Sequence, residues 1–385
     1  MSPTSPAIGR QRRTLLPVFA ACAAIGLQAG INMPLVPMAL AQQGHDRLTI
    51  GIVSAVWAVG MLSLGTRIPA LAARLGAAPA IIGAVVIGAL VNVAYTVTSG
   101  PIAWGVLNFL HGMVGGVPWV VSEIWMNVVV EENRRGRVMG LYGALVAVGM
   151  ALGPLVLQVV GVYGPLPFLT GAALSLLVAA PLLPYWRSAP RIRVDKSSGF
   201  ARVVLLAPLG MFAAFSCGLG EQVAFSFLPV YAVGAGVPPG TGALWLSAFV
   251  MGNVILQWPI GWLADHADRR LVLAGCAGAS GLLVLGLSVI PAQWAGTVGV
   301  VMLWGGISFS IYPVSLALVG QRFRGGDIAR ANTAFSMIYI VGGLLGKPLT
   351  GLAMDMFGDP GLGWTLAVFY GAATLAALLA MRRSG

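Results

Sequence analysis

The sequence predicts an all-α polytopic membrane protein in which twelve transmembrane helices form two six-helix bundles. Three observations predict this fold: the composition, the number of long apolar runs and the placement of the basic residues. Of the 385 residues, 58% are hydrophobic and only 9% are charged. A water-soluble domain carries about 25% charged residues, so the composition excludes a soluble enzyme and a soluble nucleic-acid-binding protein.

Twelve apolar runs have roughly the length of about 20 residues that a helix needs to cross a bilayer. Each run is bounded by charged residues, proline or glycine. The first six lie near residues 15–38, 49–66, 80–97, 102–130, 138–160 and 166–183, and the second six near residues 203–230, 241–264, 271–290, 294–319, 331–354 and 364–379. The runs fill the chain, so we expect no soluble domain in the loops.

The basic residues gather in every second loop between these runs, which places them on one side of the predicted membrane. Of the 22 Lys and Arg residues, 20 fall on one side of the predicted membrane, Arg47 alone falls on the other, and Lys347 lies inside a run. Because Lys and Arg accumulate in cytoplasmic loops, we expect both termini to be cytoplasmic and the protein to lie in a bacterial-type inner membrane. The net charge of +11 then reflects orientation, and we expect no nucleic-acid partner.

The first run has an alternative interpretation as a cleavable signal peptide, because basic residues precede it and Ala39-Leu40-Ala41 follows it. The run is too long for a signal core, so we expect it to remain as the first span. The three cysteines share no metal-binding or redox spacing. We therefore expect them to fill space, and we expect neither a metal site nor a cofactor.

The chain contains an internal repeat, because a shift of 192 to 194 residues superposes its two halves. Gly26-Leu27 falls on Gly218-Leu219, and Pro154-Leu155 falls on Pro348-Leu349. We expect an N-terminal bundle over residues 1–186, a cytoplasmic linker over 187–202 and a C-terminal bundle over 203–385. Parallel repeats are typical of transporters that bind substrate between two bundles and expose it alternately to each side of the membrane.

Residues 261–271, with the sequence GWLADHADRRL, are similar to the G-x-L-a-D-r-x-G-r-R cytoplasmic loop of the major facilitator superfamily. The whole chain resembles this family, although the matching first-half loop at 69–76 lacks the acidic residue. The resemblance implies that Asp265, Arg269 and Arg270 act in gating, with Arg330 or Arg137 as candidate partners of Asp265. The alternative is that these loop charges only anchor the loop.

The fifth run contains Gly149 and the pair Gly153-Pro154. This pattern resembles the glycine-proline signature of drug and metabolite exporters of the superfamily, although Leu157-Gln158 replaces its last two glycines. Small residues allow close helix contacts and proline permits a bend, so these residues are candidates for gating. The resemblance favours export. The alternative is that these residues only pack helices together and do not indicate the direction of transport.

The fourth run contains Asn108 and His111-Gly112, which align with the R-x-x-Q-G pattern of the family. In proton-coupled members the arginine of this pattern is linked to proton transfer, and its replacement by Asn108 puts that route in doubt. His111 is a candidate for proton coupling, and the alternative is a structural hydrogen bond.

Ionisable groups inside spans are costly and usually functional, and three occur here: Glu123, Glu221 and Lys347. Glu221 and Lys347 lie about equally deep, as counted from the starts of their spans at the helical rise, so we expect them to pair. This pair is either permanent or broken when Glu221 takes up a proton or substrate. Glu123 is the first candidate for the coupling proton, and the alternative is a carboxylate that reaches the surface and bonds to Ser122 or a helix end.

Polar and aromatic side chains within the spans are candidates for substrate binding. They are Gln28, Asn32, Asn108, Trp119, Gln222, Trp304 and Tyr312. Spans 1 and 7 contain no Lys or Arg, which disfavours a strongly anionic substrate and favours a neutral or cationic organic molecule.

These observations predict a monomeric secondary active transporter that exports a small organic solute in exchange for protons. The alternative is proton-coupled uptake of a neutral nutrient such as a vitamin-like compound. A channel is disfavoured because the runs contain no ring of like charges. An enzyme is disfavoured because the three histidines are scattered along the chain.

Overall fold

The computed structural model describes residues 6–65, 67–130, 132–186, 204–323 and 326–382. Within these residues it contains helices and no strand. The first half consists of α1 (Pro6–Gln42), α2 (Arg47–Gly65), α3 (Ile68–Leu75), α4 (Ala77–Val97), α5 (Pro101–Val129), α6 (Glu132–Val160) and α7 (Pro165–Ala179), which continues as the 3-10 helix η1 (Ala180–Tyr185). The second half consists of α9 (Pro208–Gly234), α10 (Pro239–His266), α11 (Arg269–Leu287), α12 (Gly296–Gly320), α13 (Gly326–Phe357) and α14 (Pro360–Arg382). The predicted linker, residues 187–202, lies outside the described residues.

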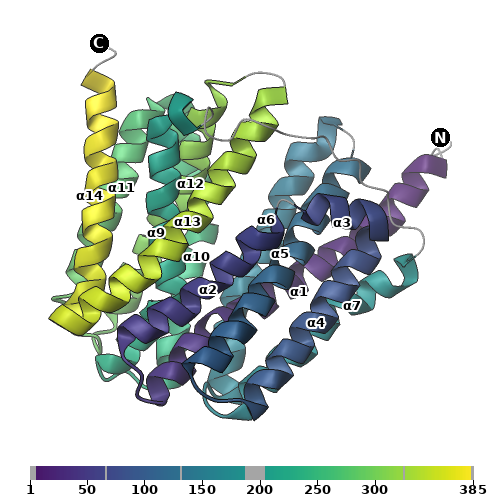
Figure 1. The fold of residues 1–385 in the computed structure, drawn as a ribbon. Helices are drawn as coiled ribbons and strands as arrows, with labels where there is room; N and C mark the ends of the chain where they lie inside the picture. Colours follow the sequence, from purple (N-terminus) through teal and green to yellow (C-terminus); the bar gives the residue numbers. More distant parts are fainter. Residues whose placement is uncertain (1–5, 66, 131, 187–203, 324–325, 383–385) are drawn as a thin grey trace.

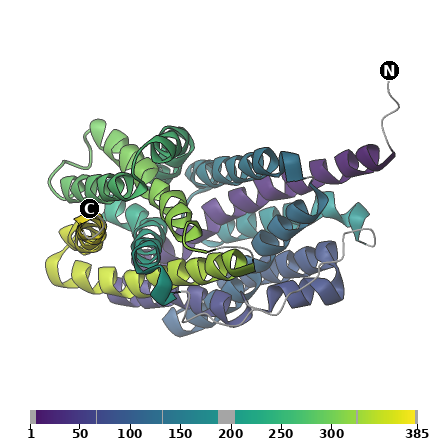
Figure 2. The ribbon, with the colours of Figure 1, turned by 90° about the horizontal axis from the view of Figure 1, so that it is seen from above.

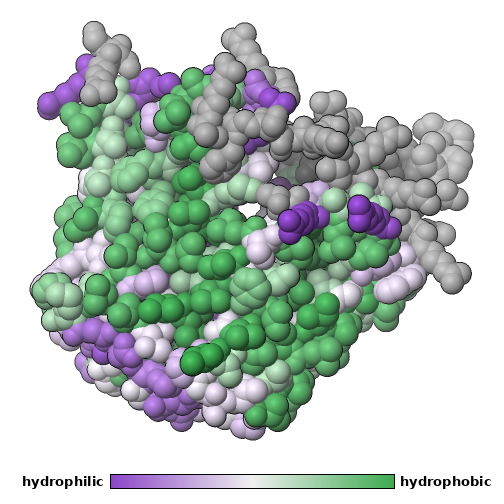
Figure 3. All heavy atoms as spheres, in the orientation of Figure 1, coloured by the Kyte–Doolittle hydropathy of each residue, from purple (hydrophilic) through white to green (hydrophobic). Residues whose placement is uncertain are grey.

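Twelve of the described helices are long and apolar enough to cross a membrane, and each matches one predicted run, which confirms the predicted fold class. Figure 3 shows hydrophobic side chains over the middle of the molecule and hydrophilic ones at its upper and lower ends. Large apolar side chains such as Ile102 and Val159 are more than four-fifths exposed, at 85% and 88%. Such exposure is expected where the solvent is lipid.

Helix α3 was not predicted, because the sequence indicates a loop there. Pro69 occupies its first turn, where a proline costs no hydrogen bond. Ile68 and Ala72 are buried on one face of α3, and Arg74 lies in its last turn, next to the helix's negative end. The residues that resemble a family loop thus form a short helix beside the spans.

The two bundles lie side by side, and both have the same internal arrangement (Figures 1 and 2). In the first bundle α1 packs on α6, α2 on α5 and α4 on α7. In the second bundle the equivalent helices repeat these pairs, as α9 on α13, α10 on α12 and α11 on α14. The two largest contacts between the bundles, α2 with α13 and α6 with α10, are also equivalent under the repeat, and α1 packs on its own equivalent, α9.

Glycines allow the backbones of the paired helices to contact each other directly. Gly26 of α1 faces the backbone of Val146 on α6, and Gly218 of α9 faces the backbone of Tyr339 on α13. A Cβ atom at either position would overlap the facing carbonyl group. Gly26 and Gly218 are equivalent in the repeat, so the same close helix contact occurs in both bundles.

The helices α2 and α13 run antiparallel, and we call their contact, which is one of those between the bundles, the α2–α13 seam. Gly51 of α2 faces the backbone of Lys347, and Gly351 of α13 faces the backbone of Arg47. Each helix therefore places a glycine against the backbone of the other, four residues apart. The seam lies at the end of the molecule opposite the chain termini, where Figure 1 shows the bundles approaching each other. We call this end the Arg47 end.

Candidate functional site

A buried carboxylate, Glu221, lies inside the second bundle, where three helices meet. Its side chain on α9 is only 3% exposed. Tyr339 on α13 donates its hydroxyl to Oε2 of Glu221 at 2.6 Å, and Cys217, one turn earlier on α9, donates its thiol to Oε1 at 2.8 Å. The Cys217 sulfur also lies 3.7 Å from the carbonyl oxygen of Ser308 on α12. Glu221 is thus held by hydrogen-bond donors from two helices and contacts the third through Cys217.

Tyr312 of α12 extends this cluster towards the first bundle. Its ring packs edge-on against Tyr339, with ring centroids 5.4 Å apart, and against Phe335 at 4.9 Å. Tyr312 interacts electrostatically with both Glu221 and Glu123. Because Glu123 belongs to α5, Tyr312 lies within range of a carboxylate from each bundle.

Glu123 itself is exposed, whereas the residues before and after its position on α5 are mostly buried. The neighbouring Ser122 is buried, and its hydroxyl lies 3.0 Å from the carbonyl oxygen of Trp119 and 3.4 Å from the hydroxyl of Tyr142. Tyr142 also interacts electrostatically with Glu123. The exposure agrees with the alternative interpretation of Glu123 as a carboxylate that reaches a surface.

Lys347 does not pair with Glu221, which corrects the expectation from their similar depth. Its Nζ atom donates to the carbonyl oxygen of Ser54 on α2 at 3.3 Å, and its side chain is 6% exposed. Within the described residues, the ion pairs are Arg47–Asp359, Arg269–Asp265 and Arg330–Asp327. Depth fixes only the position along the helix axis. Lys347 points into the α2–α13 seam, whereas Glu221 faces Tyr339 and Cys217.

Three of the candidate substrate residues lie inside the first bundle. Gln28 donates its amide to Ser175 of α7 at 2.7 Å, and the Asn32 amide lies against Gly171 of the same helix. Asn108 donates to the carbonyl oxygen of Val53 on α2 at 2.7 Å. The bonds of Gln28 and Asn108 therefore stabilise contacts between helices of one bundle, whereas the Asn32 amide is buried without a hydrogen-bond partner among the described residues. Substrate binding by these three residues stays a prediction. His111, one turn after Asn108, is also buried.

The remaining candidates are split between the two bundles. Gln222 packs against Gly343 of α13 and bonds to Tyr339, so it joins the cluster around Glu221. Trp304 is fully buried against Phe249, with ring centroids 4.7 Å apart. Trp119 is half-buried on α5. The structure thus brings Glu221, Gln222 and Tyr312 together and leaves Trp304 in the bundle interior.

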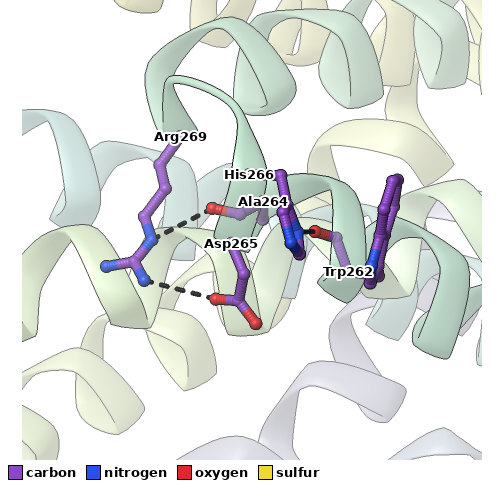
Figure 4. Close-up of polar contacts among 5 residues, drawn as sticks. All are labelled: Trp262, Ala264, Asp265, His266 and Arg269. Atoms are coloured by element: carbon purple, nitrogen blue, oxygen red, sulfur yellow. Dashed lines mark hydrogen bonds and ion pairs between the residues drawn. The ribbon is translucent and has the colours of Figure 1, made fainter.

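The candidate gating loop joins α10 to α11 (Figure 4). Arg269, the first residue of α11, lies 3.4 Å from Asp265 near the end of α10, and its Nε donates to the carbonyl oxygen of Ala264 at 3.3 Å. Asp268 caps α11 by accepting the backbone N–H of Arg270 at 2.8 Å, and the Arg270 guanidinium donates to Ala380 of α14 at 3.0 Å. The loop therefore ties α10, α11 and α14 together within the second bundle.

Neither candidate partner of Asp265 pairs with it. Arg330 forms its ion pair with Asp327, three residues earlier on α13, at 3.0 Å. Arg137 lies on α6 beside a cavity that Phe19 and Leu141 also line. The expectation that Arg330 or Arg137 pairs with Asp265 is therefore corrected, because Arg269, the first residue of α11, takes that place.

The glycines of the fifth span pack α6 against α1. Gly149 faces the backbone of Ala23, and Gly153 faces the backbone of Gly30. Pro154 lies within α6 without ending it. This packing accounts for the small residues, and a role in directing export stays a prediction.

The sequence did not identify Tyr339 or Cys217 as site residues. Cys217 precedes Glu221 by four residues, a spacing that places two side chains on one helix face. The sequence therefore indicated that these two side chains could contact each other. Tyr339 lies 118 residues away from Glu221 and has no local signal.

Comparison with known proteins identifies relatives over most of the chain. The family model described as Major Facilitator Superfamily matches residues 18–210 and 210–384. An uncharacterized MFS-type transporter, YcaD, of Salmonella arizonae is 26% identical over 328 residues, which cover 84% of this chain and 85% of that protein. YcaD of Escherichia coli O45:K1 is 27% identical over 330 residues, with the same coverage.

Solved structures with the same fold are much more distant in sequence. The nucleoside transporter NupG superposes with a TM-score of 0.78 at 15% identity, covering 96% of this chain and 98% of NupG. A bacterial homologue of the human lysosomal transporter Spinster gives 0.78 at 14% identity, covering 98% of each chain. The E. coli fucose:proton symporter FucP gives 0.60 at 18% identity, covering 94% of this chain and 98% of FucP.

Proposed function

The chain belongs to the major facilitator superfamily and is a secondary transporter, and from this premise we propose that it exports a small neutral or cationic organic solute in exchange for protons. In the proposed cycle the two bundles open alternately at each end around a central site. Both termini are assigned to the cytoplasm of a bacterial inner membrane, so the Arg47 end faces outward.

The observation that carries this proposal is the hydrogen-bonded Glu221 carboxylate. A charged carboxylate accepts from both Tyr339 and Cys217. A protonated one has an O–H of its own and accepts less well, so proton uptake competes with the contact between α9 and α13. A cationic or hydroxyl-bearing solute competes for the same oxygens. Proton and solute would then displace each other, which is the requirement for exchange.

The surroundings of Glu221 support a neutral or cationic solute. None of the ion pairs in the described part of the chain includes Glu221. Tyr339 bonds to Glu221, and the ring of Tyr312 packs edge-on against those of Tyr339 and Phe335. Aromatic rings attract cations and stack on flat organic molecules, whereas a strongly anionic solute would be repelled by Glu221.

Lys347 and His111 are assigned secondary roles in proton coupling. Lys347 lies in the seam that must open at the Arg47 end, so its hydration changes during the cycle. His111 is buried in the interior of the first bundle. Asp265, Arg269 and Arg270 are assigned to the opposite end, where they fix α10 to α11 and α14.

Proton-coupled uptake of a neutral nutrient is the second candidate. The replacement of the last two glycines of the exporter signature by Leu157-Gln158 weakens the case for export. A structure of the same fold is that of a fucose:proton symporter, although at 18% identity it supports only the fold.

Proteoliposomes with an imposed pH gradient test the proposal. The probes are uridine, fucose and tetraphenylphosphonium, and an internal pH dye records proton flux in parallel. We expect a probe to move against the proton gradient in the wild type, with Glu221→Gln abolishing probe-coupled proton flux and Glu123→Gln reducing it. Asp327→Asn, which changes an exposed carboxylate of an intrahelical pair, is the matched control. Movement of probe and protons in the same direction would replace export by uptake, and full coupling in Glu221→Gln would contradict the coupling role.

A further inference from the structure

Every formally charged residue at the Arg47 end lies in one place. The connections at this end are residues 43–46, 98–100, 161–164, 235–238, 288–295 and 358–359, and all of them are described by the structure. Their charged residues, together with those at the adjoining helix ends, are Asp46, Arg47, Asp355 and Asp359. Asp46 and Arg47 come from the first bundle, and Asp355 and Asp359 come from the second.

These residues bond directly across the two bundles. A terminal nitrogen of Arg47 lies 2.6 Å from Oδ1 of Asp359. Asp355 accepts the backbone N–H of Arg47 at 3.0 Å and that of Leu48 at 2.8 Å. These N–H groups belong to the first turn of α2, where no intrahelical acceptor is available. The second bundle thus caps a helix of the first.

The capping contact is specific to the closed arrangement of this end. Asp46 accepts the N–H of Thr49 at 3.1 Å and so satisfies one first-turn donor from its own bundle. Asp355 satisfies two others, and these lose their acceptor when α13 moves away. One turn along each helix, Gly51 and Gly351 keep the backbones of α2 and α13 in contact. Asp355 therefore reaches α2 only while the seam is closed.

We propose that Arg47, Asp355 and Asp359 form a latch that holds the Arg47 end closed and sets how often it opens. The inference rests on alternating access as the proposed function, because a latch matters only if this end opens. The charged cluster is placed where separation of the bundles exposes four unsatisfied groups at once: the guanidinium, two carboxylates and the α2 N-terminus. The latch therefore favours the closed state through contacts that the open state lacks.

Labelling of a cysteine at the seam measures the opening without any solute. Val230 is 6% exposed and lines a cavity of about 220 Å³ beside Arg47, together with Met38 and Ile50 of the first bundle. Val230→Cys in intact cells is exposed to a membrane-impermeant maleimide. The three native cysteines are buried, so the parent chain gives the background rate.

We expect Arg47→Ala and Asp359→Ala to raise the labelling rate of Val230→Cys by about 2- to 5-fold, the range for loss of a partly exposed ion pair. Asp355→Ala, which removes a helix cap, should raise it by about 2- to 10-fold. Arg47→Lys should stay close to the parent rate, and so should Arg330→Ala, which breaks an ion pair within one helix.

Exchange of the charges separates the latch from a general loss of packing. The double variant Arg47→Asp/Asp359→Arg should return labelling towards the parent rate if the pair itself holds the end closed. Parent rates in Arg47→Ala, Asp355→Ala and Asp359→Ala would overturn the latch, and so would equal acceleration by Arg330→Ala. Because labelling needs neither protons nor solute, that outcome is distinct from failure of the proton flux assay.

Discussion

The hydroxyl of Tyr339 lies 2.6 Å from the carboxylate of Glu221, which joins α13 to α9 inside the second bundle. The same two helices pack at backbone distance, through Gly218 against Tyr339 and Gly342 against Phe215. The hydrogen bond is therefore supported by a rigid glycine contact at the same residue. When the protonation of Glu221 changes, α9 and α13 are packed too closely for their side chains to adjust without a movement of the helices.

Tyr339→Phe tests whether Glu221 acts through this bond. We expect gradient-driven probe flux to fall by about tenfold, since a hydrogen bond to a charged group is worth about 1.5–3 kcal/mol. In a Glu221→Gln background the same change should have little further effect, because the two residues act as one unit. The measurement is initial flux in proteoliposomes.

Tyr231→Phe is the control for this double-mutant cycle, because the Tyr231 hydroxyl donates to the carbonyl oxygen of Leu287, far from Glu221 in the same bundle. Equal and additive losses from Tyr339→Phe and Glu221→Gln would show that the two residues act independently.

Gly342→Ala should destabilise the second bundle. Its Cβ atom would overlap the Phe215 carbonyl group, which cannot move without shifting α9. Overpacking of this kind costs about 1–3 kcal/mol, so we expect a lower melting temperature in detergent. Gly371→Ala on α14 is the matched control, because nothing lies within 4 Å of that position. A melting temperature unchanged in Gly342→Ala would mean that the two helices do not approach this closely.

The architecture was predictable because it depends on patterns that repeat along the chain. Span length, alternation of basic loops and the 192- to 194-residue repeat gave the twelve helices, and the structure confirms them. The expected Glu221–Lys347 pair was wrong because sequence gives the depth of a residue and not the direction in which its helix face points. Asp355 and Asp359 are more than 300 residues from Arg47, so nothing local connects them.

The pH dependence of stability should include a contribution from Asp46. Hydrogen bonds from the side chain and backbone N–H of Thr49 hold the pKa of Asp46 below its ordinary value. A group with a lowered folded-state pKa contributes stability above its unfolded pKa of about 3.9 and loses it as the pH falls through the folded pKa. Asp46→Ala should therefore lower the melting temperature at pH 7, and this difference should vanish in strong acid. A difference that persists unchanged in acid would assign the effect to packing.

Lys347→Met should make the protein more stable and less active. The Lys347 ammonium is buried in the seam and bonds to the Ser54 carbonyl oxygen at 3.3 Å, and no described carboxylate lies within ion-pair distance of it. A lysine at the centre of a span costs about 2.5–3.5 kcal/mol, and one hydrogen bond to a charged group returns about 1.5–3 kcal/mol of this. Methionine fills similar space without the charge, so we expect a higher melting temperature and slower labelling of Val230→Cys. Transport should fall, because a seam that closes too firmly opens rarely. A lower melting temperature in Lys347→Met would instead mean that the seam depends on the charge of Lys347, and Lys347→Arg would then restore the wild-type value.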